Sequence, residues 1–399
     1  MSIQLNKKKI ILRAPLLCHA GYGVHSRQVA RWLLEKQEQD PSIQLVMDPV
    51  SWGETPWIVN PDAEGGLIAK ILERCSKREN DSYDVSFQLQ LPNEWNPFLA
   101  EKNIGLSAVV EADKCNPEWI SSVNRMDLVI VPSEFSKNVL NNSGQVEVPV
   151  LVVPEAFPDE LVQFEPESDI NLGIETDFNF LVFGQITGHT ADNDRKNLAY
   201  TLKWLCDEFE DRQDIGIVVK TNLGRQSALD RVRTVNFLNQ ILSQVKNPSS
   251  VGPRIYLLHG AMNNQEIASL YKHSKIKALV SLTRGEGFGL PMLEAAACGL
   301  PVIATNWSAH TEFLNKGKFV KVDYSLQPIP ESRVDGAIWM ANSRWANAKE
   351  DDAKRTFRKF VESSALPREW AASLKQTIQR DYCFSSISEQ YDKAIKGIL

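Results

Sequence analysis

The residues of this chain that are best suited to chemistry lie in one segment, residues 281–314. An apolar run ends near Leu282, a glycine-rich turn carrying Glu286 follows, and Pro291 suits the first position of a helix that also carries Glu294. Glycines let a backbone approach a ligand closely, and exposed amides at a helix start suit a diphosphate. We therefore expect Glu286 to face a bound ligand. A carboxylate at Glu294, favoured by the helix dipole, can accept hydrogen bonds from sugar hydroxyls.

A single G-x-G turn is common in βαβ units, so the argument depends on the whole string. Residues 286–302 read EGFGLPMLEAAACGLPV, which resembles the E-x7-E signature of family 4 glycosyltransferases, EGFGLP-x-LEA-x-A-x-G-x-PV. The resemblance implies a GT-B fold, retention of anomeric configuration and no obligatory metal. It also implies that Glu286 contacts the donor sugar and Glu294 the nucleotide ribose. The implied cradle for the diphosphate is the turn Gly287, Phe288, Gly289 and Leu290.

Basic residues that neutralise the donor diphosphate are the next feature of that family. The family's Gly-Arg pair reads Gly184-Gln185 here, so we expect Arg195 or Lys196, which follow in the same loop, to replace the missing arginine. Lys220, at the end of the predicted strand 215–219, is the second candidate, because a cation there can stabilise charge on a leaving phosphate. The predicted catalytic set is therefore Glu286, Arg195, Lys196 and Lys220. A solvated loop cation is the alternative for each basic residue.

The same loop contains Asp192-Asn193-Asp194, a D-x-D string. Such strings bind metal together with diphosphates in a different glycosyltransferase fold, but polar loops also contain them by chance. We expect no metal here and no obligatory cofactor. The expected co-substrate is a nucleotide sugar, with a UDP-sugar favoured.

Three further positions resemble parts of the family site. Gly21-Tyr22-Gly23 precedes a predicted helix and resembles the glycine loop that the family places near the donor phosphate, so we expect a donor-binding role for Gly23, with a plain tight turn as the alternative. The family's sugar-binding histidine is replaced by Glu111-Ala-Asp113, and either Glu111 or Asp113 can bind sugar or acceptor. His310, near a predicted helix start, can approach the sugar, or can instead cap or pack the helix.

These residues need a scaffold, and the whole chain alternates short apolar runs with helical patterns, which is typical of α/β layers with parallel sheets. The alternation is interrupted by a Pro- and acid-rich stretch from Pro158 to Asp177. We predict an α/β GT-B fold of two Rossmann-like domains facing across a cleft. The expected boundaries are 1–158 for an N-terminal acceptor domain, 159–177 for a linker, 178–380 for a nucleotide-sugar donor domain, and 381–399 for a C-terminal helix that crosses back to the N-terminal domain.

Composition narrows the function classes. The chain has 399 residues, with 43% hydrophobic and 24% charged residues, and it has no apolar stretch long enough to span a membrane. Its net charge of −6 offers no global attraction to nucleic acid or anionic lipid. Six scattered cysteines indicate a reduced, cytoplasmic protein without structural zinc. Nothing in the composition fixes the oligomeric state.

The acceptor remains open between two hydroxyl compounds. A saccharide is favoured. However, the strings AGYGVHSRQVARWLL, LPNEWNP and IGLSAVVEADKCNPEW resemble glycosyltransferases of tailed phages, some of which add sugars such as arabinose to hydroxymethylated cytosine. In that alternative, arabinose from UDP-arabinose would be transferred to 5-hydroxymethylcytosine of DNA in the host cytoplasm, which requires a basic groove and an accessible base.

Two other classes share the fold. A sugar-nucleotide epimerase or phosphorylase needs an acid/base set or a pyridoxal-binding lysine that the sequence does not display. A catalytically silent nucleotide-binding protein is disfavoured by the intact set of Glu286, Glu294 and Lys196.

Overall fold

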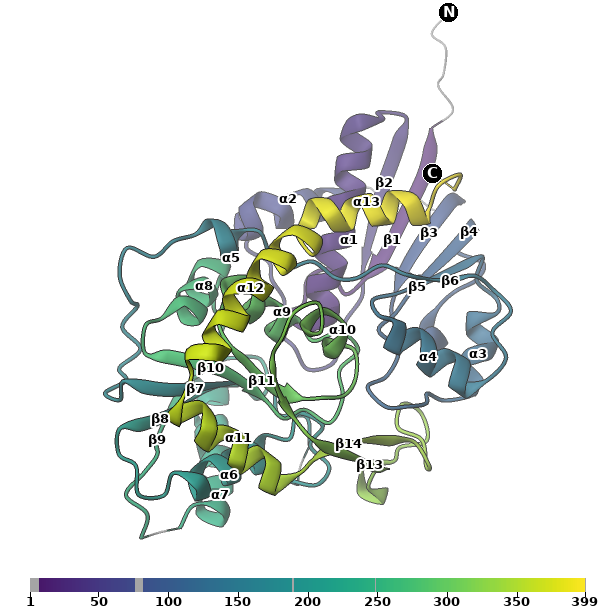
Figure 1. Cartoon of the computed structure of the whole chain (residues 1–399). Helices are drawn as coiled ribbons and strands as arrows, with labels where there is room; N and C mark the ends of the chain where they lie inside the picture. The colour runs from purple at the N-terminus through teal and green to yellow at the C-terminus, as the bar shows by residue number, and fades with distance from the viewer. Residues whose placement is uncertain (1–6, 76–81, 189, 248, 399) are drawn as a thin grey trace, which may run out of the picture. The chain divides into compact units, whose positions relative to one another are not determined.

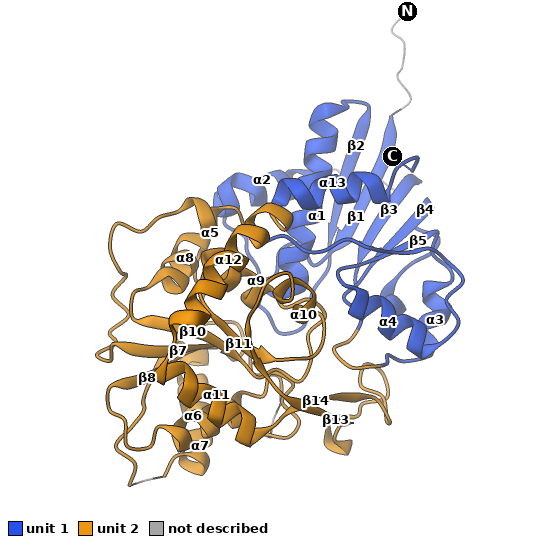
Figure 2. Cartoon of the chain, viewed as in Figure 1, with its two compact units in different colours: residues 1–109, 114–156, 384–399 blue, residues 110–113, 157–383 orange. Residues whose placement is uncertain are grey.

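The computed structural model describes residues 7–75, 82–188, 190–247 and 249–398. Its strands form two parallel sheets, which are accompanied by helices, and one small antiparallel hairpin (Figure 1). The chain divides into two compact units (Figure 2). Unit 1 comprises Met1–Val109, Lys114–Ala156 and Phe384–Leu399, and unit 2 comprises Val110–Asp113 and Phe157–Cys383.

Unit 1 is built on a six-stranded parallel sheet in the order β2-β1-β3-β4-β5-β6. The strands are β1 (Lys8–Ala14), β2 (Ile43–Pro49), β3 (Tyr83–Leu89), β4 (Ala100–Leu106), β5 (Leu128–Val131) and β6 (Val150–Val152). The helices are α1 (Gly21–Gln39), α2 (Ala63–Cys75), α3 (Glu118–Val123), α4 (Glu134–Ser143) and α13 (Phe384–Ala394).

The last helix, α13, packs on α1 within unit 1. Trp32 of α1 is fully buried, stacks on Tyr391 with ring centroids 5.0 Å apart, and donates its indole N–H to Asp392 at 2.9 Å. Deeper in the same contact, His25 Nε2 lies 2.8 Å from the Tyr391 hydroxyl. Burial of these aromatic surfaces against the sheet holds α13 in unit 1, although almost the whole of unit 2 precedes it in the sequence.

Unit 2 is built on a second six-stranded parallel sheet in the order β12-β11-β10-β7-β8-β9. Its strands match the apolar runs of the second half: β7 (Phe178–Phe183), β8 (Ile215–Lys220), β9 (Arg254–Leu258), β10 (Ile276–Ser281), β11 (Val302–Thr305) and β12 (Val320–Val322). The helices are α5 (Glu160–Gln163), α6 (Leu198–Glu208), α7 (Ala228–Val245), α8 (Asn264–Lys272), α9 (Leu290–Cys298), α10 (His310–Leu314), α11 (Glu350–Glu362) and α12 (Ala365–Asp381).

A β-hairpin in unit 2 is a feature that the sequence analysis missed. Strands β13 (Tyr324–Pro328) and β14 (Arg344–Ala348) pair antiparallel, and a short 3-10 turn, η2 (Glu331–Arg333), lies in the segment between them. The two strands are far apart in sequence and polar on one side, so no short turn signal marks them. The hairpin nevertheless bears on the site, because Ala346 of β14 donates its N–H to the Arg284 carbonyl at 2.9 Å.

Neither unit is a continuous stretch of sequence. The polar stretch 159–177, expected as a linker, lies in unit 2 and includes α5. The short segment Val110–Asp113 also lies in unit 2, although unit 1 supplies the chain on both sides of it. Within the described residues, no helix has the length and apolar character needed to cross a membrane.

Candidate active site

The site of unit 2 lies where the strand order of its sheet reverses. The strands β7 and β10 are neighbours in the sheet. From β7 the chain continues to β8 and β9 on one side, and from β10 it continues to β11 and β12 on the other side. Ligands of open α/β sheets bind beyond the carboxyl ends of strands at such a switch point. The basic loop 184–197 follows β7, and the glycine-rich turn 282–289 follows β10. Both segments that the sequence analysis selected therefore lie at this switch point.

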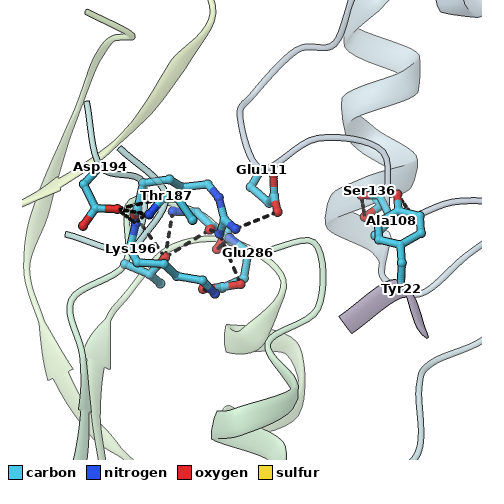
Figure 3. A network of polar contacts seen from close by, with 12 residues as sticks. Tyr22, Ala108, Glu111, Ser136, Thr187, Asp194, Lys196 and Glu286 are labelled. Atoms are coloured by element: carbon cyan, nitrogen blue, oxygen red, sulfur yellow. Dashed lines mark hydrogen bonds and ion pairs between the residues drawn. The ribbon is translucent and has the colours of Figure 1, made fainter. Parts of the chain in front are cut away.

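Glu286 is the centre of a buried ion-pair network at this point. Its Oε1 accepts a hydrogen bond from Lys196 Nζ at 2.6 Å, and its Oε2 lies 3.4 Å from an Arg195 guanidinium nitrogen (Figure 3). The Glu286 side chain is 8% exposed. Arg195 also donates to the Gly285 carbonyl at 2.7 Å, which fixes its guanidinium against the turn. The structure thus brings Glu286 together with Lys196, ninety positions earlier in the sequence, and with the adjacent Arg195.

The electrostatics of this network favour the ionised form of Glu286. Burial alone would raise the pKa of Glu286, but the adjacent Lys196 and Arg195 outweigh it and lower the pKa to about 2. Burial alone would lower the pKa of Arg195, but the neighbouring carboxylates of Glu111 and Glu286 outweigh it and raise the pKa. The Glu286–Arg195 ion pair is therefore charged near neutrality, at the place where a diphosphate is expected.

Glu111 and Asp113 meet different partners within unit 2. Glu111 Oε1 lies 3.1 Å from an Arg195 nitrogen, so Glu111 joins the network (Figure 3). The Asp113 carboxylate instead accepts from the backbone N–H of Arg344 at 2.6 Å and from its Nε at 2.8 Å. Asp113 therefore ties the segment 110–113 to the start of β14, whereas the carboxylate of Glu111 reaches the Arg195–Glu286 pair.

Residues at and just before the start of α10 pack against the turn around Glu286. The Glu286 N–H donates to Ser308 Oγ at 2.9 Å, and His310 Nε2 lies 2.7 Å from the Thr305 carbonyl. His310 is fully buried, and burial lowers its pKa. Gly289 adopts φ of 105°, and a Cβ there would lie 2.9 Å from His310 Cβ. His310 therefore packs under the turn, and its approach to a sugar stays a prediction.

The helix α9 begins at this turn and presents its first backbone amides there. The first amides of a helix have no intrahelical partners, which makes this end an anion site. Pro291 stands at the second position and Phe288 packs on Phe313 with ring centroids 5.4 Å apart. An aromatic contact thus anchors one side of the turn, Gly289 is the N-cap residue, and Leu290 is the first residue of α9.

Glu294 lies in the second turn of α9. It is not fully ionised near neutrality, although the helix dipole would favour the charged carboxylate. Burial raises its pKa to about 7, against a hydrogen bond of 3.1 Å from the Tyr271 hydroxyl that lowers it. The influence of the dipole is confined to the first turn of a helix, and Glu294 is the fifth residue of α9. Desolvation therefore prevails, and Glu294 is poised to lose a proton near neutral pH.

Lys220 occupies the predicted strand end but is bonded elsewhere. Its Nζ donates to the carbonyl of Gly260, in the loop that follows β9. Burial lowers the pKa of Lys220 to about 8. Lys220 therefore lies at the carboxyl edge of the same sheet, beside the strand that leads to Lys196, with its charge partly suppressed.

The D-x-D string forms the scaffold of the basic loop. Asp194 accepts from Thr187 Oγ1 at 2.6 Å and from the Leu198 N–H at 2.9 Å, so its carboxylate closes the loop and caps α6 (Figure 3). Asp192 accepts from the Tyr200 hydroxyl at 2.7 Å. Within the described part of the chain, no three His, Cys, Asp or Glu side chains are grouped to hold a metal ion.

Arg284 joins the two halves of the site, and the sequence analysis did not single it out. Its Nε donates to the Asp194 carbonyl at 3.2 Å, and its guanidinium carbon lies 5.4 Å from the centre of the Trp345 ring. Arg284 is buried, as are the other residues that were missed. Its place directly before Gly285-Glu286 was the one available signal. Ser308 and Tyr271 had none, because their roles depend on tertiary contacts.

The glycine loop of unit 1 is held tightly. A Cβ at Gly23 would lie 2.1 Å from the Cys18 carbonyl oxygen, whereas a Cβ at Gly21 would meet nothing within 4 Å. The Tyr22 hydroxyl lies 3.0 Å from Ser107 Oγ and accepts the Ala108 N–H at 3.1 Å (Figure 3). Gly23 thus has a structural requirement of its own, and its donor-binding role stays a prediction.

A family comparison matches the segment that carries the site. Residues 255–329 match the family described as Glycosyl transferases group 1, which includes Glu286, α9 and Glu294. No curated protein sequence matches the chain significantly.

Solved structures match almost the whole chain. Sucrose-phosphate synthase from Thermosynechococcus elongatus is 14% identical with a TM-score of 0.61, over 97% of this chain and 98% of that one. HepE of Anabaena in complex with UDP and glucose is 13% identical with a TM-score of 0.58, over 97% and 99%. The structure described as trehalose-6-phosphate from E. coli bound with UDP-2-fluoro glucose is 10% identical with a TM-score of 0.62, over 98% and 100%.

At these identities the structural likeness establishes the fold, which is GT-B. The sequence comparison adds that residues 255–329 are similar to a segment of the group 1 glycosyl transferases. The Glu286 turn and the start of α9 lie inside the matched segment.

Proposed function

We propose that the chain transfers a sugar, with retention of anomeric configuration, from a nucleotide-diphosphate sugar to a saccharide hydroxyl. The observation that carries the proposal is the network of Glu286, Lys196 and Arg195 at the start of α9, at the switch point of the sheet. A carboxylate for sugar hydroxyls, two cations for a diphosphate and free helix amides are the groups that a nucleotide sugar requires.

In this proposal the donor replaces the contacts that the network makes with itself. The diphosphate takes Arg195 and Lys196 and the amides of Phe288, Gly289 and Leu290, which releases Glu286 to the sugar hydroxyls. Glu294 binds the ribose hydroxyls. A UDP-sugar is favoured because two of the similar structures hold UDP or a UDP-sugar.

The reaction is the exchange of one bond at the anomeric carbon for another on the same face. The bond between that carbon and the diphosphate oxygen breaks, and its electron pair stays on the phosphate. The acceptor oxygen bonds to the carbon while its proton passes to the departing phosphate oxygen. Arg195 and Lys196 stabilise the charge that develops on the phosphate, and Lys220 supplies a further cation at the strand edge. No step requires a metal.

The remaining assignments complete the proposal. Gly23 binds the donor and Glu111 contacts sugar or acceptor, and the reaction takes place in the cytoplasm, in keeping with six free cysteines. Asp113 and His310 hold the site together, since their polar atoms are already bonded to Arg344 and to the Thr305 carbonyl.

Calorimetry with UDP-, GDP- and ADP-glucose tests this proposal. We expect the wild type to bind one of them and Glu294→Ala to weaken it about 10-fold, the loss typical of a charged hydrogen-bond acceptor. Glu175→Ala, which removes an exposed carboxylate of unit 2, is the matched control. Hydrolysis of the bound donor should be lost in Glu286→Gln. A folded wild type that binds none of the three donors would refute the proposal.

A further inference from the structure

The guanidinium of Arg333 is a charged group without a partner. Arg333 lies in η2, between the strands of the hairpin, and is partly buried. Its Nε is fully enclosed and makes no hydrogen bond, and none of the residues that the structure describes forms a side-chain hydrogen bond or ion pair with its guanidinium. Burial of this donor lowers the pKa of Arg333, and the charge of Asp335 opposes that effect only in part.

The arginine is pre-oriented. Its guanidinium carbon lies over the Trp339 ring, 5.3 Å from the ring centre. Trp339 packs edge-on against the fully buried Trp345 at 5.7 Å, and Trp345 in turn contacts Arg284. A guanidinium stacked on one face keeps its N–H edge available for two parallel hydrogen bonds.

The segment that carries Arg333 is ordered by its own contacts. The Asp335 carboxylate accepts from three successive backbone N–H groups, those of Ala337, Ile338 and Trp339, at 2.8–2.9 Å. Ile329 and Ser343 close the base of the segment with a backbone hydrogen bond of 2.9 Å. Asp335 is thereby engaged by the backbone, and it does not pair with Arg333.

Arg333 also lies within electrostatic range of the active-site network. After burial and Asp335, the charges that act on its pKa are those of Arg195, Glu111 and Asp194. Charges of this kind interact over distances on the order of 10 Å. The three belong to the basic loop and to the segment 110–113, so the guanidinium of Arg333 lies within interaction range of the Glu111–Arg195 pair.

We propose that Arg333 binds a phosphate or carboxylate group of the sugar substrate, and so makes the enzyme selective for an anionic sugar. This inference rests on the proposed function. Arg195 and Lys196 are already matched by Glu286 and Glu111, and in the complex they serve the diphosphate. Arg333 is a further cation, and a planar guanidinium is best satisfied by a two-oxygen anion. The anion sits either on the acceptor or on the donor sugar.

The test compares neutral and anionic probes on the full chain. Calorimetry in the presence of UDP measures glucose, glucose 6-phosphate and glucuronate, and a second series measures UDP-glucose against UDP-glucuronate. We expect the wild type to prefer one anionic probe over its neutral counterpart by about 10- to 100-fold, as for a charge-assisted hydrogen bond. The first series identifies an acceptor anion and the second a donor anion.

Variants then assign the preference to Arg333. Arg333→Gln should reduce it to less than about 2-fold while leaving the affinity for UDP unchanged, and Arg333→Lys should give an intermediate value because it keeps the charge and loses the fork. Lys349→Gln, which removes an exposed cation just after β14, should retain the wild-type preference.

Two results would overturn the inference. One is a wild type that binds UDP and hydrolyses UDP-glucose but treats neutral and anionic probes alike. The other is an Arg333→Gln variant that weakens both members of a pair equally. If the wild type binds neither UDP nor any UDP-sugar, the proposed function itself fails, and the inference falls with it.

Discussion

Lys196 and Glu286 are joined by a hydrogen bond of 2.6 Å although ninety residues separate them in the sequence. The contact is made possible by β7 and β10, which are neighbours in the sheet and deliver their loops to the same edge. In the proposed function, a nucleotide sugar replaces Glu286 as the partner of Lys196. Donor binding would then exchange one set of ionic contacts for another.

The first prediction concerns Glu286→Gln. Removing the carboxylate leaves Arg195 and Lys196 without their internal counter-ion, so UDP should bind several-fold more tightly than to wild type, as measured by calorimetry. Hydrolysis of a UDP-sugar should nevertheless fall by about 100-fold or more, because the sugar contact is lost.

The matched control for this variant is Glu208→Gln, which removes a carboxylate paired with Arg358 elsewhere in unit 2. It should leave both the affinity for UDP and the hydrolysis rate unchanged. If Glu286→Gln weakened UDP and the UDP-sugar to the same degree, the exchange of ionic contacts would be wrong.

The second prediction is a pH dependence of stability through Glu294. Its pKa is raised by burial from 4.5 to about 7, so the folded state holds a proton that the unfolded chain releases. The resulting stabilisation is complete below about pH 4.5 and is lost as the pH rises through 7. Each pKa unit corresponds to about 1.4 kcal/mol. Glu294→Gln, which imitates the protonated form, should therefore gain in Tm relative to wild type between pH 5 and pH 8.5.

Thermal scans at several pH values measure this difference, with the exposed Glu175→Gln as the control. A Tm difference between Glu294→Gln and wild type that stayed constant across that range would show that Glu294 titrates normally. Donor binding should show the opposite trend and strengthen with pH, since the ionised carboxylate is the better acceptor for ribose hydroxyls.

The third prediction compares two glycines in the first turn of α1. Gly23→Ala would place a Cβ 2.1 Å from a backbone oxygen of Cys18, which cannot move as a side-chain end could. We expect a loss of about 1–3 kcal/mol, which corresponds to several degrees in Tm. Gly21→Ala meets nothing within 4 Å and should be neutral or stabilising by up to about 1 kcal/mol. Equal effects of the two substitutions would contradict this account of the loop.

The fourth prediction concerns the attachment of α13. Tyr391→Phe removes the hydroxyl that lies 2.8 Å from buried His25 and leaves a ring nitrogen without a partner, at a cost of about 1–3 kcal/mol. Tyr382→Phe is the control, because its ring is buried while its hydroxyl bonds to none of the described residues. Thermal scans should show a lower Tm for the first variant only. A similar Tm for both would mean that the His25 contact contributes little.

The sequence predicted the parallel strands and the Glu286 turn because both leave local signals. Apolar runs alternate with helical patterns, and the glycine turn before Pro291 is legible as a strand-to-helix connection. The pairing of Glu111 with Arg195 and the ionisation of Glu294 were not predictable in the same way. Both depend on which residues become neighbours and on how far they are desolvated, which only the folded chain determines.

The β13–β14 hairpin was also not predictable from the sequence. Its strands are separated by a long irregular segment, and Arg333 looks like an ordinary surface cation in the sequence. Its stacking on Trp339 and its lack of a partner become visible only with the fold.

The segments of the two units alternate along the sequence, and this order restricts how the chain can be recombined. Glu111 and Asp113 lie in a segment of unit 2 that is encoded within unit 1, and α13 belongs to unit 1 but is encoded after unit 2. A chimera that exchanged only residues 157–383 would set Arg195 and Arg344 against whatever residues the host carries at positions 111 and 113. Exchange of unit 2 as a module therefore requires Glu111 and Asp113 to be transferred together with residues 157–383.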